Sequence, residues 1–299
     1  MDLNQLKIKS LEYRKTILDI IYKSGAGHTG GSLSCIDILN VLYNKVLDIN
    51  PKNFNEKDRN HYIHSKGHSV EALYTVLCDQ GFFLRKDLEK LNHFNSHFIG
   101  HPTRKILGIE HNTGALGHGL SVAVGLALSK KIDQKTNKVF SLLGDGELSE
   151  GSVWEACTTA SKYHLDNLIV IIDRNDLQIT GKTEEVNPIE PIDKKFEAFG
   201  FETISTNGNN ISDLLYVFQH VPVKENKPTV IIAKTTKNGK PFYRFKCIDN
   251  NNNSGWVRVW GKFNEAPELY TIWVANVHND ANWGMSTSSY KIKRVTAYD

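Results

Sequence analysis

Long apolar runs, an excess of charge of one sign and closely spaced cysteines are all missing from this 299-residue sequence. No apolar run approaches the roughly 20 residues that a membrane-spanning helix needs, so we expect no membrane segment. Lys and Arg total 36 against 33 Asp and Glu, a net charge of +3. The lysines are scattered without interleaved aromatics, which argues against nucleic-acid binding.

The four cysteines, Cys35, Cys78, Cys157 and Cys247, lie far apart and match no metal-site or disulfide spacing. The first residues show no basic stretch followed by an apolar core, so we expect no secretion signal. A reducing cytoplasm is therefore the expected location. The length allows one large domain or two small ones, with ample room for a buried core.

The most informative stretch is the glycine-rich acidic sequence at residues 144–151. An apolar run at 139–143 precedes it, a helical pattern follows at 153–164, and a second apolar run covers 168–172. This order of strand, tight turn, helix and strand predicts a βαβ unit with parallel strands. Ligands bind at the carboxyl edge of such sheets.

Asp145 and Asn175 each follow one of these two strands. A carboxylate, an amide oxygen and a nearby backbone carbonyl form a hard oxygen site that suits magnesium held together with phosphate. The neighbouring glycines allow backbone amides to approach a diphosphate at the helix start. On this stretch alone, the alternative is that Asp145 merely caps the helix.

Periodicity and capping predict the remaining elements of the first 237 residues. We expect helices at 3–23, 35–46 (capped by Ser34), 70–80, 122–128 and 211–219, and strands at 59–63 and 229–233.

Three histidines stand beside glycines at expected element boundaries. His28 lies in a loop with four glycines, His68 at the start of a helix, and His101 in a Gly-His-Pro loop. Singly, each fits a structural or solvated role, but together they indicate a ligand site. The glycine-rich segment 112–120 allows close backbone approach to a cofactor or a second chain, although packing alone also explains it.

The character of the chain changes after Lys237. Residues 250–253 form a polar hinge of four asparagines, and four of the five tryptophans lie beyond it. Residues 256–260 and 270–274 are typical of strands. We therefore expect a first domain at 1–237 and a separate Trp-rich segment at 238–299.

Several motifs together resemble transketolase, specifically its amino-terminal, thiamine diphosphate-binding half, and the match is closest to split bacterial transketolases. They appear in family order over about four-fifths of the chain, at residues 23–31, 65–69, 100–102, 112–119, 144–151 and 173–181. The resemblance implies an α/β thiamine diphosphate-binding fold, with a central, mostly parallel sheet flanked by helices.

The resemblance also implies roles for individual residues toward the cofactor. Asp145, Asn175 and the carbonyl of Leu177 would bind Mg²⁺ together with the diphosphate. The Gly146 amide and His68 would contact the diphosphate itself.

Further roles concern the rest of the cofactor and the substrate. The backbone of Gly114 and Leu116 would hold the aminopyrimidine ring, and His28 and His101 would face the hydroxyls of a ketose donor as catalytic residues. Glu150 matches a buried carboxylate of the family's subunit interface, counted here as catalytic; its alternative is a plain helix-capping acid.

The implied activity is transfer of a two-carbon ketol unit from a ketose to an aldose. The family's activating glutamate and pyrimidine pocket lie in the other half of the enzyme, so a carboxy-terminal, pyrimidine-binding partner subunit is expected, in a heterotetramer acting on sugars or sugar phosphates. Two alternatives are a thiamine diphosphate-dependent decarboxylase or carboligase subunit and a non-catalytic cofactor-binding subunit. The chain departs from the family after Lys237, and Val257 rather than His follows Trp256.

Overall fold

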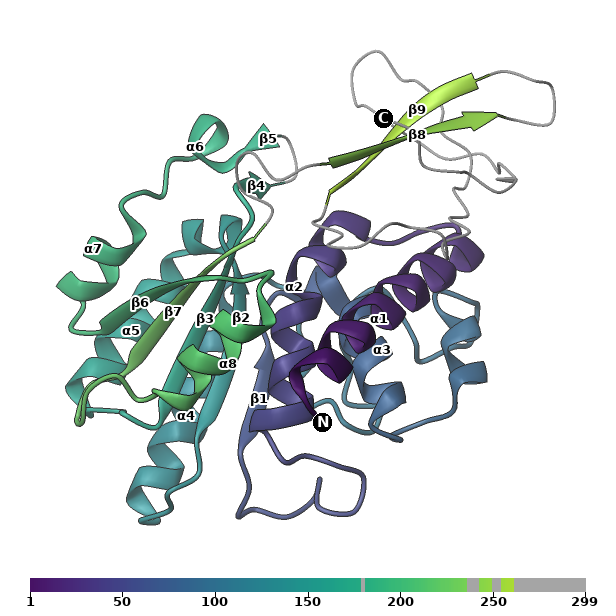
Figure 1. The fold of residues 1–299 in the computed structure, drawn as a ribbon. Coiled ribbons are helices and arrows are strands. Elements are labelled where there is room, and N and C mark those ends of the chain that lie inside the picture. The colour runs from purple at the N-terminus through teal and green to yellow at the C-terminus, as the bar shows by residue number, and fades with distance from the viewer. Residues whose placement is uncertain (179–180, 236–241, 249–253, 261–299) are drawn as a thin grey trace. The chain divides into compact units, whose positions relative to one another are not determined.

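The computed structural model describes residues 1–178, 181–235, 242–248 and 254–260 (Figure 1). Two compact units are distinguished, Met1–Thr235 and Thr236–Asp299. Within the described residues, no helix has both the length and the apolar character required to span a bilayer.

The helices of the first unit are α1 Leu3–Ser24, α2 Thr29–Val41, α3 Val70–Asp79, α4 His118–Ile132, α5 Gly151–Lys162, α6 Thr183–Val186, α7 Ile192–Ala198 and α8 Ile211–Gln219. Its strands are β1 His61–His64, β2 Val139–Gly144, β3 Leu168–Arg174, β4 Leu177–Gln178, β5 Gly181–Lys182, β6 Glu202–Asn207 and β7 Thr229–Lys234.

The main sheet has the strand order β1-β2-β3-β7-β6, and every pair in it is parallel. Helices cover both of its faces (Figure 1). This confirms the predicted α/β fold with a central parallel sheet. Strands β2, β3 and β7 are almost entirely buried because helices lie on both faces, which explains their continuous apolar sequences.

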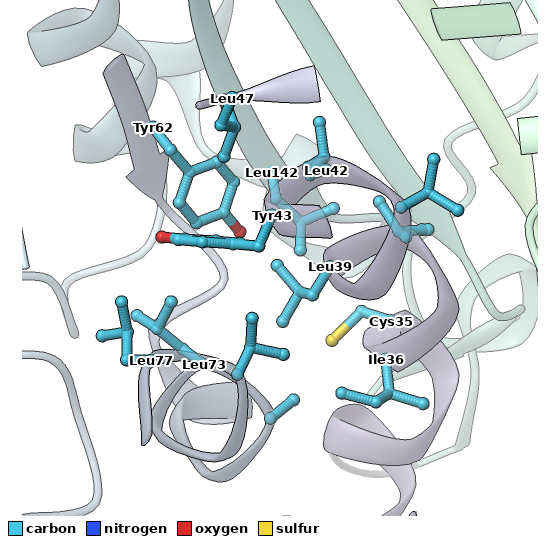
Figure 2. Close-up of a cluster of buried hydrophobic side chains, with 14 of the residues drawn as sticks. Cys35, Ile36, Leu39, Leu42, Tyr43, Leu47, Tyr62, Leu73, Leu77 and Leu142 are labelled. Carbon is cyan, nitrogen blue, oxygen red and sulfur yellow. The ribbon is translucent and has the colours of Figure 1, made fainter. Parts of the chain in front are cut away.

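Successive side chains of a strand point to opposite faces, so the sheet divides the core into two layers. Ile169 and Ile171 of β3 pack with α1, α2, α3 and α8, whereas Val170 and Ile172 pack with α4, α5 and α7. Figure 2 shows part of the first layer, in which Leu39 of α2, Leu73 of α3 and Leu142 of β2 lie together.

Most predicted elements are present with ends shifted by a few residues, but the second helix begins earlier than expected. The sequence pattern predicts a start at Cys35 with Ser34 as the cap, and that prediction is wrong. The helix α2 starts at Thr29, continues as a π-helical turn at Leu42–Val46, and has Ser34 in its interior. The Ser34 hydroxyl donates to Asp173 (2.6 Å) and lies 3.0 Å from the Gly31 carbonyl, its alternative acceptor, so tertiary and intrahelical contacts replace the capping role.

In the second unit, β8 (Phe242–Ile248) and β9 (Ser254–Trp260) form an antiparallel hairpin in which Phe242 pairs with Trp260. The strand predicted at 256–260 is therefore present. The asparagine stretch at 250–253 and the strand predicted at 270–274 lie outside the described residues.

Candidate functional site

The carboxyl ends of β1, β2 and β3 lie side by side at one edge of the main sheet. The register pairs His64 with Leu142, and Gly144 with Asp173. Segments that follow these strands, beginning at Ser65, Asp145 and Asn175, therefore leave the sheet at the same edge. The predicted ligand-binding edge is thus built from the three segments that the sequence motifs mark.

Asp145 is a buried carboxylate, only 2% exposed. Its Oδ1 accepts from the Gly146 amide at 2.8 Å, and its Oδ2 accepts from the Asp176 amide at 2.8 Å and from Arg174 at 2.9 Å. Arg174 also contacts Glu184 and Glu190, so its charge is shared among several carboxylates. Burial raises the pKa of Asp145, and the neighbouring Asp173 carboxylate raises it further, whereas Arg174 lowers it.

Asn175 lies beside Asp145 across the sheet edge, and its amide is held from both ends. Its Oδ1 accepts from the Leu177 amide at 2.9 Å, and its Nδ2 lies 3.4 Å from the Ser34 hydroxyl. Leu177 has an exposed side chain. Among the described residues, no group of three or more His, Cys, Asp or Glu side chains could hold a metal ion, so a cation here would depend on the single Asp145 carboxylate together with amide, carbonyl and ligand oxygens.

The three predicted histidines lie together. The ring centroids of His28 and His68 are 5.5 Å apart, and those of His28 and His101 are 6.2 Å apart. Burial and the nearby Lys66 lower the pKa of His68 to about 3, and burial also lowers the pKa of His101. His68 is therefore a neutral imidazole at pH 7, able both to donate and to accept hydrogen bonds.

The loop after Asn112 approaches this cluster closely at Gly114. A Cβ on Gly67 would lie 3.0 Å from the Gly114 amide nitrogen and 3.2 Å from the His101 ring, so the segments meet backbone to backbone. Leu116 is part of the same loop, and its carbonyl lies 2.9 Å from the His118 ring. The structure thus brings the Gly114 loop beside His101, one of the two histidines to which the family resemblance gives a substrate role.

The comparison with protein families matches residues 7–243 to the family described as "Transketolase, thiamine diphosphate binding domain". This chain belongs to the transketolase family. An apulose-4-phosphate transketolase subunit of Phocaeicola vulgatus is 44% identical to it over 237 residues, which cover 79% of this chain and 84% of that relative. A Clostridium protein named 6-deoxy-6-sulfo-D-fructose transketolase subunit SqwG is 38% identical and is covered to 87%.

Among solved structures, the transketolase of Campylobacter jejuni superposes with a TM-score of 0.75 at 36% identity. The superposition covers 79% of this chain and 38% of that one. The chain therefore corresponds to the thiamine diphosphate-binding part of a transketolase, and matches the relatives named as subunits over most of their length.

Two residues predicted for this transketolase site have surroundings that qualify their roles. The Gly146 amide already donates to Asp145, so contact with a diphosphate would share or replace that bond. Glu150 is exposed in the single chain and lies against Gly117, where an added Cβ would be 2.6 Å from the Glu150 Cβ. Only contact with a second chain could bury Glu150 at a subunit interface, so its role stays a prediction.

Sequence reasoning missed the buried charges that support this edge. Lys66 and Asp173 form a fully buried ion pair, and Glu147 accepts hydrogen bonds from Ser65 and from the amides of Gly117 and Gly144. The side chains of Ser65, Lys66, Glu147 and Asp173 are each at most 2% exposed. Lys66, Glu147 and Asp173 all lie within the family motifs. The motifs do not reveal that these side chains are buried, because charged residues are usually exposed.

Proposed function

We propose that this chain is the thiamine diphosphate-binding subunit of a two-subunit transketolase, which transfers a two-carbon ketol unit from a ketose to an aldose. The observation that carries the proposal is that the segments of Asp145, Asn175 and His68 leave the sheet at one edge, with His28 and His101 clustered beside His68. It is supported by the match to relatives named as transketolase subunits over more than four-fifths of their length.

The residues at this edge fit magnesium bound together with a diphosphate. Asp145, Asn175 and the Leu177 carbonyl offer hard oxygens, which Mg²⁺ prefers. Burial and repulsion from Asp173 raise the pKa of Asp145, and a divalent cation would offset both effects. Under this proposal, His68 and the Gly146 amide hold the diphosphate.

The backbone of Gly114 and Leu116 would hold the aminopyrimidine ring. When bound, thiamine diphosphate supplies the electron sink for breaking the carbon–carbon bond next to a carbonyl. Under this proposal, His28 and His101 would orient the hydroxyls of the ketose and move their protons. A neutral imidazole can accept a proton at one ring nitrogen while donating from the other.

We infer that the partner is a pyrimidine-binding, carboxy-terminal transketolase subunit, and that the complex is a heterotetramer with Glu150 at the interface.

Two relatives are named for ketoses that end in an anionic group. One name contains a sugar phosphate and the other a sulfonated sugar. We therefore propose ketoses with a terminal phosphate or sulfonate as substrates. We further propose two domains, at residues 1–237 and 238–299, and a cytoplasmic location. The described cysteines are free thiols, which accords with that location.

The test is reconstitution. The purified chain, saturated with thiamine diphosphate and Mg²⁺, is assayed against a panel of ketoses, alone and with a co-expressed pyrimidine-binding subunit. Ketol transfer is expected only in the mixture. Turnover by the chain alone would contradict the two-subunit proposal, and decarboxylation of 2-oxoacids in place of ketol transfer would favour the decarboxylase alternative.

A further inference from the structure

Glu71 is a buried carboxylate for which the proposed function provides no role. It is the second residue of α3, three residues after His68, and is 0% exposed. The ion pairs of the described part of the chain do not include Glu71. A buried charge without a cationic partner is costly and needs another source of support.

Two hydrogen bonds and a helix terminus provide that support. Glu71 Oε1 accepts from the His28 backbone amide at 3.2 Å, and Oε2 accepts from the Ser32 hydroxyl at 2.7 Å. The first turn of α3 also favours a negative charge through its unpaired amides. The loop packs directly on the carboxylate, because a Cβ on Gly27 would lie 2.8 Å from Oε1.

The same carboxylate acts on the histidine cluster through its charge. It raises the pKa of His101, against burial and the neighbouring His28, which both lower it. Within the described part of the chain, the other charged groups that act on the cluster are Lys66 and Asp173, which shift the pKa of His68 in opposite directions and neutralise one another in an ion pair. Glu71 therefore adds a negative charge that no ion pair within the described residues offsets, directly behind the loop that carries His28.

We propose that Glu71 is a positioning residue for the three-histidine cluster, which holds the His28 loop and supports a protonated imidazole when a substrate hydroxyl gives up its proton. This rests on the proposed ketol transfer. The hydroxyl proton passes to a neutral ring nitrogen of His28 or His101, the oxygen keeps the bonding electron pair, and the proton returns to the product. The positive charge on the ring lasts only for that interval, and the Glu71 carboxylate stabilises it.

The test is Glu71→Gln, which keeps an oxygen for the His28 amide and an amide group for Ser32 but removes the charge. Ring-labelled histidines are titrated by NMR in the full chain without cofactor. The titration midpoint of His101 should fall by roughly 0.5–1 pH unit. In the reconstituted enzyme, kcat should fall about tenfold with unchanged affinity for thiamine diphosphate.

Ser32→Ala is the matched control, because it removes a hydrogen bond to Glu71 and leaves the charge. Its His101 midpoint should stay at the wild-type value. An unmoved midpoint in Glu71→Gln, or an equal shift in both variants, would overturn the proposal. If Glu71→Gln does not fold, the NMR chemical shift of the Glu71 carboxyl carbon is followed in the wild type. That shift must change as the histidines titrate, and an unchanged shift would also overturn the proposal. Absence of ketol transfer by the wild-type complex would instead count against the proposed function.

Discussion

The Nζ of Lys66 lies 2.5 Å from Oδ2 of Asp173, and both side chains are excluded from solvent. The pair joins the segment after β1 to the end of β3, at the edge where the site is built. Lys66 also donates to the Gly31 carbonyl at 3.0 Å and to the Ser34 hydroxyl at 3.1 Å, and Thr235 donates to the other oxygen of Asp173. One buried ion pair therefore fixes the relative positions of four segments.

Lys66→Met should destabilise the chain by about 3–5 kcal/mol, because it leaves the Asp173 charge buried without its cation. Urea unfolding measures the change. Lys194→Met is the control, since its partner Glu197 is exposed and such surface pairs contribute about 1 kcal/mol or less. Adding Asp173→Asn to Lys66→Met should recover part of the loss, because the unpaired charge is removed. A double variant no more stable than Lys66→Met would contradict this account.

Glu147 should contribute to stability as much as the Lys66–Asp173 pair does, because it accepts hydrogen bonds from two backbone amides. Its Oε1 accepts from the Gly117 amide at 2.8 Å and its Oε2 from the Gly144 amide at 3.1 Å, in addition to the Ser65 hydroxyl. Glu147→Ala leaves these buried donors unpaired, at about 1–3 kcal/mol each. We expect a loss of about 3–6 kcal/mol in urea unfolding and faster hydrogen exchange at the Gly117 amide.

The control for Glu147 is Glu155→Ala, an exposed position on α5, which should change the unfolding free energy by about 0.5 kcal/mol or less. Unchanged exchange at Gly117 in Glu147→Ala would show that the loop is held by other contacts.

The sequence predicted the parts of the fold that depend on local pattern. The apolar runs of β2 and β3 mark strands buried on both faces, and the short connection through α5 requires them to be parallel neighbours. β6 was missed because Glu202–Asn207 is a largely polar sequence at the sheet edge, where burial is partial. Its place is set by pairing with β7, which no local pattern encodes.

The site shows the same division. Gly-rich motifs marked the positions of His28, His68, His101 and Asp145, and the structure brings these histidines together. The supporting charges of Glu71, Lys66 and Glu147 were not predicted, because their burial depends on segments far away in the sequence, and charged residues are usually exposed. A protein can bury such groups only where distant donors meet them, and that is a property of the tertiary structure.

His64 should make the chain sensitive to acid. Its ring is buried between the Tyr62 hydroxyl (2.7 Å to Nδ1) and the Ser69 hydroxyl (3.0 Å to Nε2), and burial lowers its pKa from 6.5 to about 3. The unfolded chain therefore binds a proton at higher pH than the folded one. Stability from this group is intact above pH 6.5 and is lost by about 1.4 kcal/mol per pH unit as the pH falls from there toward 3.

The measurement for His64 is the pH dependence of urea unfolding between pH 7 and 5. His64→Gln is expected to have a shallower loss of stability with falling pH than the wild type, whatever its stability at pH 7. His97→Gln, at an exposed position, should follow the wild-type slope. Equal slopes for His64→Gln and the wild type would show that the His64 ring takes up its proton in the folded chain.

Asp145→Ala should abolish magnesium-dependent binding of thiamine diphosphate. Asp145 is the charged member of the proposed ligand set, and its loss beside a diphosphate should weaken cofactor binding by about 2–5 kcal/mol. Calorimetry of the isolated chain with thiamine diphosphate, with and without Mg²⁺, measures this directly.

The Asp145→Ala variant also leaves Arg174 and the Asp176 amide without this acceptor, so its unfolding free energy must be measured in parallel. Asp176→Ala, which removes a different ion pair of Arg174, is the control and should retain magnesium-dependent binding. Unchanged cofactor affinity in a folded Asp145→Ala variant would exclude Asp145 as a ligand of the metal, because a diphosphate and an amide alone would then be sufficient to hold it.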